Sequence, residues 1–353
     1  MKFSVMLTTA KPDHSTQGEI LDATMGYALT AEKCGYDTAW LLEHHFTPYG
    51  ICPSTLMMAG YVLGATSAIN VGTAIVVAPF DHPVKIAENV ALLDQLSRGR
   101  LKLGLGRGFF PRDFEVFGVD PARSHEALYE CYDVCLRAWT QNTVSNDGPL
   151  HPFPEIAVYP RVYTKPHPPI WCAGQSSSTV EWAAKRAIPL LMPSTLDAEE
   201  TTTRMELYNN TATDAGHDPD QIEHALICIG YVYDSRQEAQ DVLVRDLEWW
   251  SDEGVRVGFT VDQLKNLPNY RFHYRAIEQA ALQNEWNGEY MIRKAFEVNP
   301  VGTAEQCVEA IEELASISGA KEIVFAIEGA GKPTLINENI ERLATEVMPK
   351  VSV

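Results

Sequence analysis

Residues 70–108 read NVGTAIVVAPFDHPVKIAENVALLDQLSRGRLKLGLGRG, and this stretch decides the fold. It holds two largely apolar runs, Asn70–Val77 and Leu101–Gly106, on either side of a helical pattern at Pro83–Leu96 that has proline in its first turn. The order of strand, helix and strand predicts a right-handed crossover between two parallel strands. Runs that are apolar on both faces are typical of strands buried under a layer of helices.

The same alternation continues in both directions from this unit, and it predicts eight strands with helices between them. The predicted strands are Lys2–Leu7, Thr38–Glu43, Asn70–Val77, Leu101–Gly106, Pro169–Ala173, Leu190–Pro193, Ala225–Val232 and Glu322–Ile327. The predicted helices are Gly18–Cys34, Ser54–Ala68, Pro83–Leu96, Ser124–Trp139, Ser178–Arg186, Ala198–Ala215 and Ser235–Trp250. No G-x-G-x-x-G fingerprint of an open dinucleotide-binding sheet follows the first strand. We therefore predict an α/β fold with a single closed (β/α)8 barrel, a TIM barrel, over residues 1–353.

The alternation fails twice, at residues 141–165 and 251–298. The first segment is rich in proline and polar residues, and the second mixes charged, aromatic and amide residues without a strand pattern. We predict that both are insertions in the barrel. Long excursions often cover the active end of a barrel, so the second is predicted to be a lid, whereas a plain surface loop is equally compatible with the first.

Charge and length exclude several classes of function. The 353 residues include 28 Lys and Arg against 47 Asp and Glu, so the net charge is −19 at pH 7. Such a chain lacks the basic face that binds nucleic acid, and an anionic membrane surface would repel it. The apolar stretch at the start is too short for a signal peptide, and no run approaches the roughly 18 residues that span a bilayer. We therefore expect a cytoplasmic protein with a small, neutral or modestly anionic substrate.

Seven cysteines are scattered without a C-x-x-C pair, which favours reduced thiols in the core. Cys131 and Cys135 lie four residues apart on a predicted helix and could form half of a metal site, but no second pair completes it. We expect no metal. The absence of G-x-S-x-G, H-E-x-x-H and Walker motifs argues against serine hydrolases, zinc proteases and nucleoside triphosphatases, which leaves cofactor chemistry.

Two adjacent histidines, His44 and His45, end the second predicted strand in the sequence WLLEHHF. Catalytic side chains of barrels gather at the carboxyl ends of the strands. Neighbouring residues on a strand point in opposite directions, so these two imidazoles are not expected to bind one metal ion together. A histidine that transfers a proton is the favoured interpretation, and two polar residues of a surface loop are the alternative.

Anion-binding residues follow two other predicted strands. Arg107 comes after the glycine-rich end of Leu101–Gly106, and Ser176, Ser178 and Thr179 lie at the start of a predicted helix. Free N–H groups and hydroxyls at a helix start suit a phosphate, and an arginine at the same end of the barrel could clamp it. Ordinary helix caps and a solvated arginine are the alternatives. Asp113 could hold a protonated base or could cap a helix.

Five segments of the chain together resemble the α subunit of bacterial luciferase, and with it the luciferase-like family of flavin-dependent monooxygenases. The resemblance extends from Met1 to about Pro349, and it weakens across Gln141–Lys165 and Gly258–Arg293. The segments are WLLEHHF, NVGTAIVVAPFDHPVKIAENVALLDQLSRGR, GRGFFPRDFEVFG, SSSTVEWAA and EVNPVGTAEQC.

The resemblance implies a reaction in which reduced FMN and O2 oxidise a long-chain aliphatic aldehyde to the acid through a flavin C4a-peroxide, with or without light. It implies catalytic roles for His44 as the base, for Asp113 near the reacting end of the flavin, and for the adjacent His45. It also implies a cis peptide bond between Ala74 and Ile75. The implied cofactor-binding residues are Leu42, Ala74, Ile75, Arg107, Gly174, Gln175, Ser176 and Thr179.

The resemblance also implies partners. Because the barrel occupies the whole chain, no nicotinamide-binding domain remains, and a separate flavin reductase is expected to supply FMNH2. Gly60, Gly64 and Ala68 recur every four residues on a predicted helix, in the segment that luciferase uses between its subunits. A homodimer, or a heterodimer with a homologous subunit, is therefore expected, while close packing of this helix on its own barrel is the alternative.

The chain departs from luciferase at several positions. Gly106 replaces a reactive cysteine, Gln175 replaces an acidic residue, and a second phosphate-binding arginine falls near His125, with Arg123 two residues away as a substitute. These departures leave light emission, aldehyde length and the strength of phosphate binding open. Two alternatives remain. One is a Baeyer–Villiger-type or deazaflavin-dependent oxidoreductase of the same fold, and the other is a non-catalytic flavin-binding or partner subunit.

Overall fold

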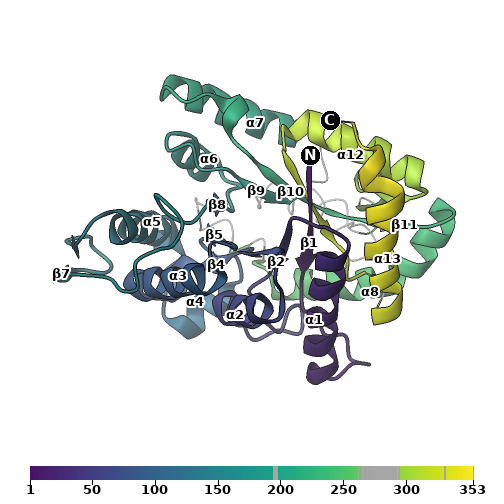
Figure 1. Cartoon of the computed structure of the whole chain (residues 1–353), viewed down its shortest axis with the longest axis horizontal. Helices are drawn as coiled ribbons and strands as arrows, with labels where there is room; N and C mark the ends of the chain where they lie inside the picture. The colour runs from purple at the N-terminus through teal and green to yellow at the C-terminus, as the bar shows by residue number, and fades with distance from the viewer. Residues whose placement is uncertain are drawn as a thin grey trace.

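Parallel strands follow one another around the barrel wall, and Figure 1 shows helices around them. The computed structural model describes residues 1–193, 198–260, 262–263, 267, 270, 292, 295–329 and 331–352. The strands pair in the order β4, β5, β3, β2, β1, β13, β10, β9, and β8 pairs with β5. Their bounds are β1 (Lys2–Leu7), β2 (Thr38–Leu41), β3 (Asn70–Thr73), β4 (Val76–Val77), β5 (Leu101–Gly106), β8 (Ile170–Cys172), β9 (Leu191–Pro193), β10 (Ala225–Ile229) and β13 (Glu322–Ala326).

The ring of strands closes between β8 and β9. Cys172 forms a parallel bridge with Leu190, and the Cys172 N–H donates to the Pro189 carbonyl over 2.9 Å. All eight predicted strands are present, but two of the predicted runs are divided: Asn70–Val77 into β3 and β4, and Ala225–Val232 into β10 and β11 (Tyr231–Val232). The prediction of a closed (β/α)8 barrel is therefore confirmed.

The helices pack on the outside of the barrel, and their ends match the predicted ranges within three residues except at α8. The α8 helix runs on to Val257, so residues 251–257 of the predicted second insertion are helical. Most of that insertion lies outside the described residues. The predicted helices are observed as α1 (Gln17–Lys33), α2 (Thr55–Ala65), α3 (Pro83–Ser97), α5 (Ser124–Thr140), α6 (Ser177–Ala184), α7 (Ala198–Asp214) and α8 (Arg236–Val257).

Several elements were not predicted from the sequence patterns. The first insertion carries an antiparallel hairpin of β6 (Val144–Asn146) and β7 (Phe153–Ile156), so it is more than a plain loop. The remaining elements are α4 (Pro111–Phe117), α12 (Ala304–Ser318), α13 (Pro333–Arg342), the strand β12 (Val301–Gly302), which pairs in parallel with β11, the 3-10 turns η1 (Ala78–Phe80), η2 (Pro121–Arg123), η3 (Pro219–Gln221) and η6 (Met348–Lys350), and the π-helical turn η5 (Leu343–Val347).

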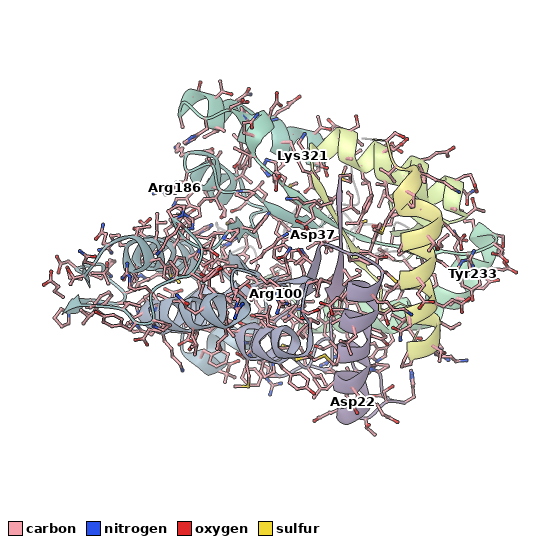
Figure 2. The ribbon with its side chains drawn as sticks, viewed as in Figure 1. Asp22, Asp37, Arg100, Arg186, Tyr233 and Lys321 are labelled. Atoms are coloured by element: carbon pink, nitrogen blue, oxygen red, sulfur yellow. The ribbon has the colours of Figure 1, made fainter. Side chains whose placement is uncertain are left out.

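Arg100 ties the end of α2 to the start of β5. Its position is labelled in Figure 2. The last carbonyls of a helix have no partner within the helix and need donors from elsewhere. The Arg100 guanidinium donates over 2.9–3.1 Å to the carbonyls of Leu63 in the last turn of α2, of Thr66, its C-cap residue, and of Ile69, just before β3. The residue just before β5 therefore fixes where α2 ends against the barrel.

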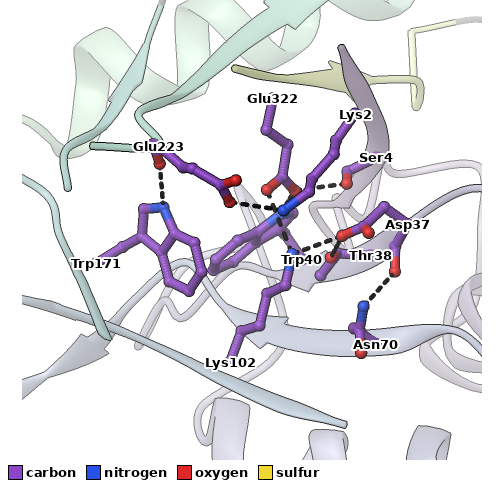
Figure 3. A network of polar contacts seen from close by, with 10 residues as sticks. All are labelled: Lys2, Ser4, Asp37, Thr38, Trp40, Asn70, Lys102, Trp171, Glu223 and Glu322. Carbon is purple, nitrogen blue, oxygen red and sulfur yellow. Dashed lines mark hydrogen bonds and ion pairs between the residues drawn. The ribbon is translucent and has the colours of Figure 1, made fainter. Parts of the chain in front are cut away.

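A buried ion network fills the amino-terminal end of the barrel, as Figure 3 shows. Lys102 on β5 lies 2.5 Å from an Asp37 carboxylate oxygen and 3.3 Å from Glu322 on β13. The second oxygen of Glu322 accepts from the Trp40 indole N–H over 2.8 Å and from the Ser4 hydroxyl over 2.6 Å. Burial opposes ionisation of Asp37, but the Lys102 ammonium outweighs it and holds the pKa of that carboxyl below its usual range. This end of the barrel is plugged, which leaves the opposite end for a ligand.

Apolar side chains from the strands fill the barrel interior above the ion network. Trp40 and Trp171 meet edge to face, with ring centroids 5.4 Å apart, and Met6, Leu191 and Val324 pack around them. The interior is a packed core, as in other barrels of this size. Across the described part of the chain, we find no helix with the length and apolar character needed to cross a membrane.

Candidate active site

His44 lies just after β2, at the carboxyl end of the barrel. Its ring packs edge-on against Tyr49, with centroids 4.8 Å apart, and against Phe110 at 5.0 Å. The Nε2 atom is buried and has no hydrogen-bond partner among the described residues. Burial first, and then the neighbouring His45, lower the pKa of His44 to about 3. The imidazole is therefore neutral, and it is a weaker base than the imidazole near pH 7 that the sequence predicts.

His45 points to a different part of the site, as predicted for adjacent residues. Its ring packs against Phe117 at 4.9 Å and Phe80 at 6.0 Å, and its Nε2 lies 3.8 Å from a carboxylate oxygen of Glu43. The Glu43 carboxylate accepts hydrogen bonds from the Thr55 hydroxyl and from two backbone N–H groups. The two imidazoles thus do not converge on one point, which agrees with the prediction that they do not share a metal ion.

Asp113 belongs to the group formed by Glu43 and His45. It is buried in the first turn of α4, and its side chain does not cap that helix, because Phe110 occupies the cap position. Burial raises the pKa of Asp113 to about 6, while His45 lowers it and Glu43 raises it further. The interpretation of Asp113 as a helix cap is therefore wrong. A carboxyl that titrates near pH 6 can exchange a proton under neutral conditions.

A second polar cluster, the hydroxyl cluster, joins the start of α6 to α5 and to the loop after β5. The Ser176 hydroxyl lies 3.0 Å from that of Thr179, and His125 Nε2 lies 3.4 Å from the hydroxyls of both Ser176 and Ser178. Ser176 is the N-cap residue of α6, yet its hydroxyl makes no capping bond. The alternative that Ser176 is an ordinary cap is therefore not supported, and its hydroxyl is directed into the cluster.

Arg107 completes this cluster with a positive charge. Its side chain is buried, and its guanidinium lies over the Tyr270 ring at 3.9 Å from the centroid. Arg107 is also close enough to His125 to lower the pKa of that imidazole. A buried guanidinium, several hydroxyls and a helix amino terminus are the donors that bind a phosphate. Through His125, the structure thus links Arg107 to Ser176 and Thr179, and their role as a phosphate site stays a prediction.

The remaining predicted residues follow β2, β3 and β8 at the same end of the barrel. Ala74 and Ile75 separate β3 from β4, and the peptide bond between them is cis, as the family resemblance implies. A Cβ atom built on Gly106 would fall 2.0 Å from Ile75 Cδ1, so glycine lets that side chain occupy the space beside β5. Gly174 and Gln175 lie on the loop between β8 and α6, and Leu42 follows β2.

Two further residues, Tyr270 beside Arg107 and Glu328 beside Thr8, have no role predicted from the sequence. Glu328 follows β13 at the same end of the barrel, where it accepts from the Thr8 hydroxyl and leaves its Oε1 buried without a partner among the described residues. Burial raises the pKa of this carboxyl to about 7. A glutamate directly after a predicted strand was a usable signal, because polar residues at that end of a barrel are commonly functional. Tyr270 falls in the poorly matching segment and carried no such signal.

Comparisons with known proteins agree with this architecture. The family described as Luciferase-like monooxygenase matches residues 1–321. The alkanal monooxygenase alpha chain of the Kryptophanaron alfredi symbiont is 34% identical over 349 residues, which cover 99% of this chain and 98% of that protein. The alkanal monooxygenase alpha chain of Aliivibrio fischeri is 36% identical over 317 residues, which cover 90% and 89% of the two chains.

Solved structures share the fold. The monooxygenase RslO1 from Streptomyces bottropensis superposes with a TM-score of 0.82 at 23% identity, with complete coverage of both chains. The oxygenating constituent of 3,6-diketocamphane monooxygenase from Pseudomonas putida, in complex with FMN, gives a TM-score of 0.79 at 18% identity, covering 100% and 99%. The coenzyme F420 dependent tetrahydromethanopterin reductase from Methanopyrus kandleri gives 0.74 at 19% identity, covering 99% of each chain. Because the family match spans most of the chain and relatives above 30% identity span nearly all of it, this chain belongs to the luciferase-like monooxygenase family.

Proposed function

We propose that this chain uses reduced FMN and O2 to oxidise a long-chain aliphatic aldehyde to the carboxylic acid. That the chain is a flavin-dependent monooxygenase follows from its family. The aldehyde is proposed because the relatives that match nearly the whole chain are alkanal monooxygenase alpha chains. The observation that carries the proposal is a neutral, buried His44 at the same end of the barrel as the Arg107 and hydroxyl cluster.

The residues at this end of the barrel fit FMN on two grounds. Ser176 makes no capping bond and directs its hydroxyl to that of Thr179 in the first turn of α6, and the buried Arg107 guanidinium lies near His125 in the same cluster, which together form the donor set of a phosphate. The unpartnered Nε2 of His44 lies among aromatic rings, where a flat ring system with polar edge atoms would find both a stacking surface and a hydrogen-bond partner. We therefore propose that Arg107, Ser176 and Thr179 hold the phosphate and that Leu42, Ala74 and Ile75 contact the flavin ring.

Each residue group has a separate task in this proposal. When bound, reduced FMN supplies the electrons that activate O2. We propose that the neutral His44 ring carries its proton at Nδ1, so that the unpartnered Nε2 is the acceptor that receives a proton. The rings of Tyr49 and Phe110 exclude water from the imidazole, which protects reactive species from hydrolysis. Asp113, whose pKa burial raises to about 6, is a second group in the site that can exchange a proton.

We also propose a partner subunit that covers α2 and α3. Met57 and Tyr61 on α2 are 79% and 63% exposed, and Leu96 on α3 is 72% exposed. Gly60 packs within the chain, since an added Cβ would lie 3.2 Å from Leu93, whereas an added Cβ on Gly64 would meet nothing within 4 Å. Exposed apolar side chains beside an open glycine suit a helix of a second copy or of a homologous subunit. A separate reductase that supplies FMNH2 belongs to the same proposal.

The alternatives within the fold differ in cofactor and substrate. Solved structures of this fold include an FMN complex of a Baeyer–Villiger monooxygenase and an F420 dependent reductase, and their low identity shows the fold alone. Assays with photoreduced FMN, O2 and either decanal or a cyclic ketone separate these activities. Decanoic acid from decanal and no lactone from the ketone is the expected result. Lactone formation, or turnover only with reduced F420, would overturn the aldehyde proposal.

The substitution His44→Ala tests the proposed proton acceptor. Loss of a positioned base lowers a rate by about 10²–10⁴-fold, so aldehyde oxidation is expected to fall by that factor. FMN affinity, measured by quenching of flavin fluorescence, is expected to change by less than about threefold, because the phosphate contacts remain. His217→Ala is the matched control, since His217 Nε2 only contacts the Lys185 carbonyl. Wild-type turnover in the His44 variant would remove this residue from the mechanism.

A further inference from the structure

His125 lies on α5 and faces the start of α6 across the hydroxyl cluster. Its Nε2 is 3.4 Å from the hydroxyls of Ser176 and Ser178, and the imidazole is buried. Arg123, the other candidate for the place of a second cation, lies elsewhere. It is 43% exposed and binds Glu126 over 2.8 Å on the surface. Of the two, His125 is therefore the residue placed to contact an anion that binds in the hydroxyl cluster.

The charge of the site does not match a phosphate when His125 is neutral. Burial first, and then Arg107, lower the pKa of His125 to about 4, so among the described residues of the hydroxyl cluster the positive charge comes from the Arg107 guanidinium and not from His125. A phosphomonoester carries a charge of about −1.5 to −2 near pH 7. One further positive charge would balance a dianion, and the imidazole can supply it by taking up a proton at Nε2.

We propose that His125 takes up a proton when the terminal phosphate of the cofactor enters the hydroxyl cluster, and that this protonated imidazole clamps the phosphate together with Arg107. The inference rests on the proposed function, because FMN is the source of the phosphate. The hydroxyls of Ser176 and Ser178 can rotate, so they accept from the protonated ring or donate to the phosphate as required. The affinity for FMN then depends on pH, whereas that for riboflavin, which has no phosphate, does not.

Among the described residues, the titratable groups beside Arg107 and His125 are Tyr129, Tyr270 and Cys172, and none of them changes charge near neutral pH. Tyr129 on α5 and Tyr270 both have a pKa raised by burial, and burial raises the pKa of Cys172 on β8 to about 12. Arg107 stays protonated, because a guanidinium holds its proton throughout this range. From α6 the facing groups are the hydroxyls of Ser176, Ser178 and Thr179, which do not titrate. A dependence between pH 6.5 and 8.5 therefore reports His125, since the phosphate itself titrates near about 6.

The direction of the effect follows from linkage. If binding takes up a proton, the affinity rises as pH falls, by up to about tenfold per pH unit for one full proton. We expect FMN to bind at least about fivefold more tightly at pH 6.5 than at pH 8.5. Titrations of the whole chain with oxidised FMN and with riboflavin, followed by flavin fluorescence, measure this ratio. Calorimetry of the wild-type chain at pH 7.5 in two buffers of different ionisation enthalpy measures the proton uptake directly.

Three variants separate this inference from the proposed function. His125→Gln is expected to bind FMN more weakly and with no dependence on pH, and His125→Arg to bind it tightly, also without that dependence. Arg123→Gln is the control and should behave as the wild type, because the Arg123 guanidinium binds Glu126 on the surface of α5. An unchanged pH profile in His125→Gln, or no proton uptake by the wild type, overturns the role of His125. Failure of the wild type to bind either flavin overturns the proposed function instead.

Discussion

Glu328 is a residue whose burial changes how the stability of the protein responds to pH. Its pKa is raised from the ordinary 4.5 to about 7, chiefly by burial. Between these two values the folded chain binds more protons than the unfolded chain, so this carboxyl lowers the free energy of unfolding as pH rises from about 4.5 to about 7. Once the Glu328 carboxyl is fully ionised in the folded chain, above about pH 7, the shift amounts to a loss of about 3 kcal/mol in unfolding free energy.

The substitution Glu328→Gln removes this ionisation and keeps the hydrogen bond from Thr8. We expect the variant to exceed the wild type in unfolding free energy at pH 8 and to match it at pH 5, because the wild-type carboxyl is protonated at the lower pH. Urea denaturation at the two pH values measures the difference. Equal pH dependence in the two proteins would show that Glu328 ionises normally in the folded chain.

Gly106 ends β5, and its missing side chain makes room for Ile75. In Gly106→Ala the new methyl group would require Ile75 Cδ1, now 2.0 Å from that position, to move. We expect a loss of about 1–3 kcal/mol in unfolding free energy from overpacking, together with weaker FMN binding because Ile75 faces the proposed flavin site. Gly26→Ala is the matched control. An added Cβ at Gly26 in α1 would meet nothing within 4 Å, so this change should stabilise the chain by about 0.4–1 kcal/mol.

At the scale of elements, the sequence predicts strands better than the short pieces between them. The eight strands were predictable because long apolar runs are uncommon outside a buried sheet. The helix α4 was missed because it spans only seven residues, and the β7 strand was missed because its side chains are largely exposed. The helix α12 could have been predicted, since Thr303 and Gln306 form a capping box at its start.

The candidate site was predictable only where a local pattern carried it. Arg107, Ser176 and Thr179 follow strand ends or start a helix, so position along the chain was enough to group them. His125 lies inside a helix, and its contact with Ser176 arises only when α5 packs beside α6. The low pKa of His44 likewise depends on the rings of Tyr49 and Phe110 that the fold brings around it.

At the scale of the whole molecule, the ion network at the amino-terminal end of the barrel joins β1, β2, β5 and β13 (Figure 3). In Lys102→Met two carboxylates, Asp37 and Glu322, would lose their buried cation. We expect the unfolding free energy to fall by about 3–5 kcal/mol, since removing one partner leaves an uncompensated buried charge. Thermal or urea denaturation near pH 7 measures this loss.

A surface pair provides the control for this prediction. Lys350 lies 3.5 Å from Glu305, and both side chains are more than half exposed. In Lys350→Met we expect a change of at most about 0.5 kcal/mol, because solvent screens the exposed pair. Similar losses in the two variants would mean that the network at the end of the barrel contributes no more than an exposed ion pair does.

The opposite orientations of His44 and His45 have a consequence for how this segment can evolve. Inserting one residue between Leu41 and His44 would move the His44 ring towards the place beside Phe80, and deleting one would move the His45 ring towards the place beside Tyr49, so in each case one of the two places would lose its imidazole. Replacing one side chain in this stretch alters its own contacts, whereas an insertion or deletion changes the surroundings of both imidazoles at once. Homologous chains with the same chemistry should therefore vary here in composition but keep the spacing between strand end and histidines fixed.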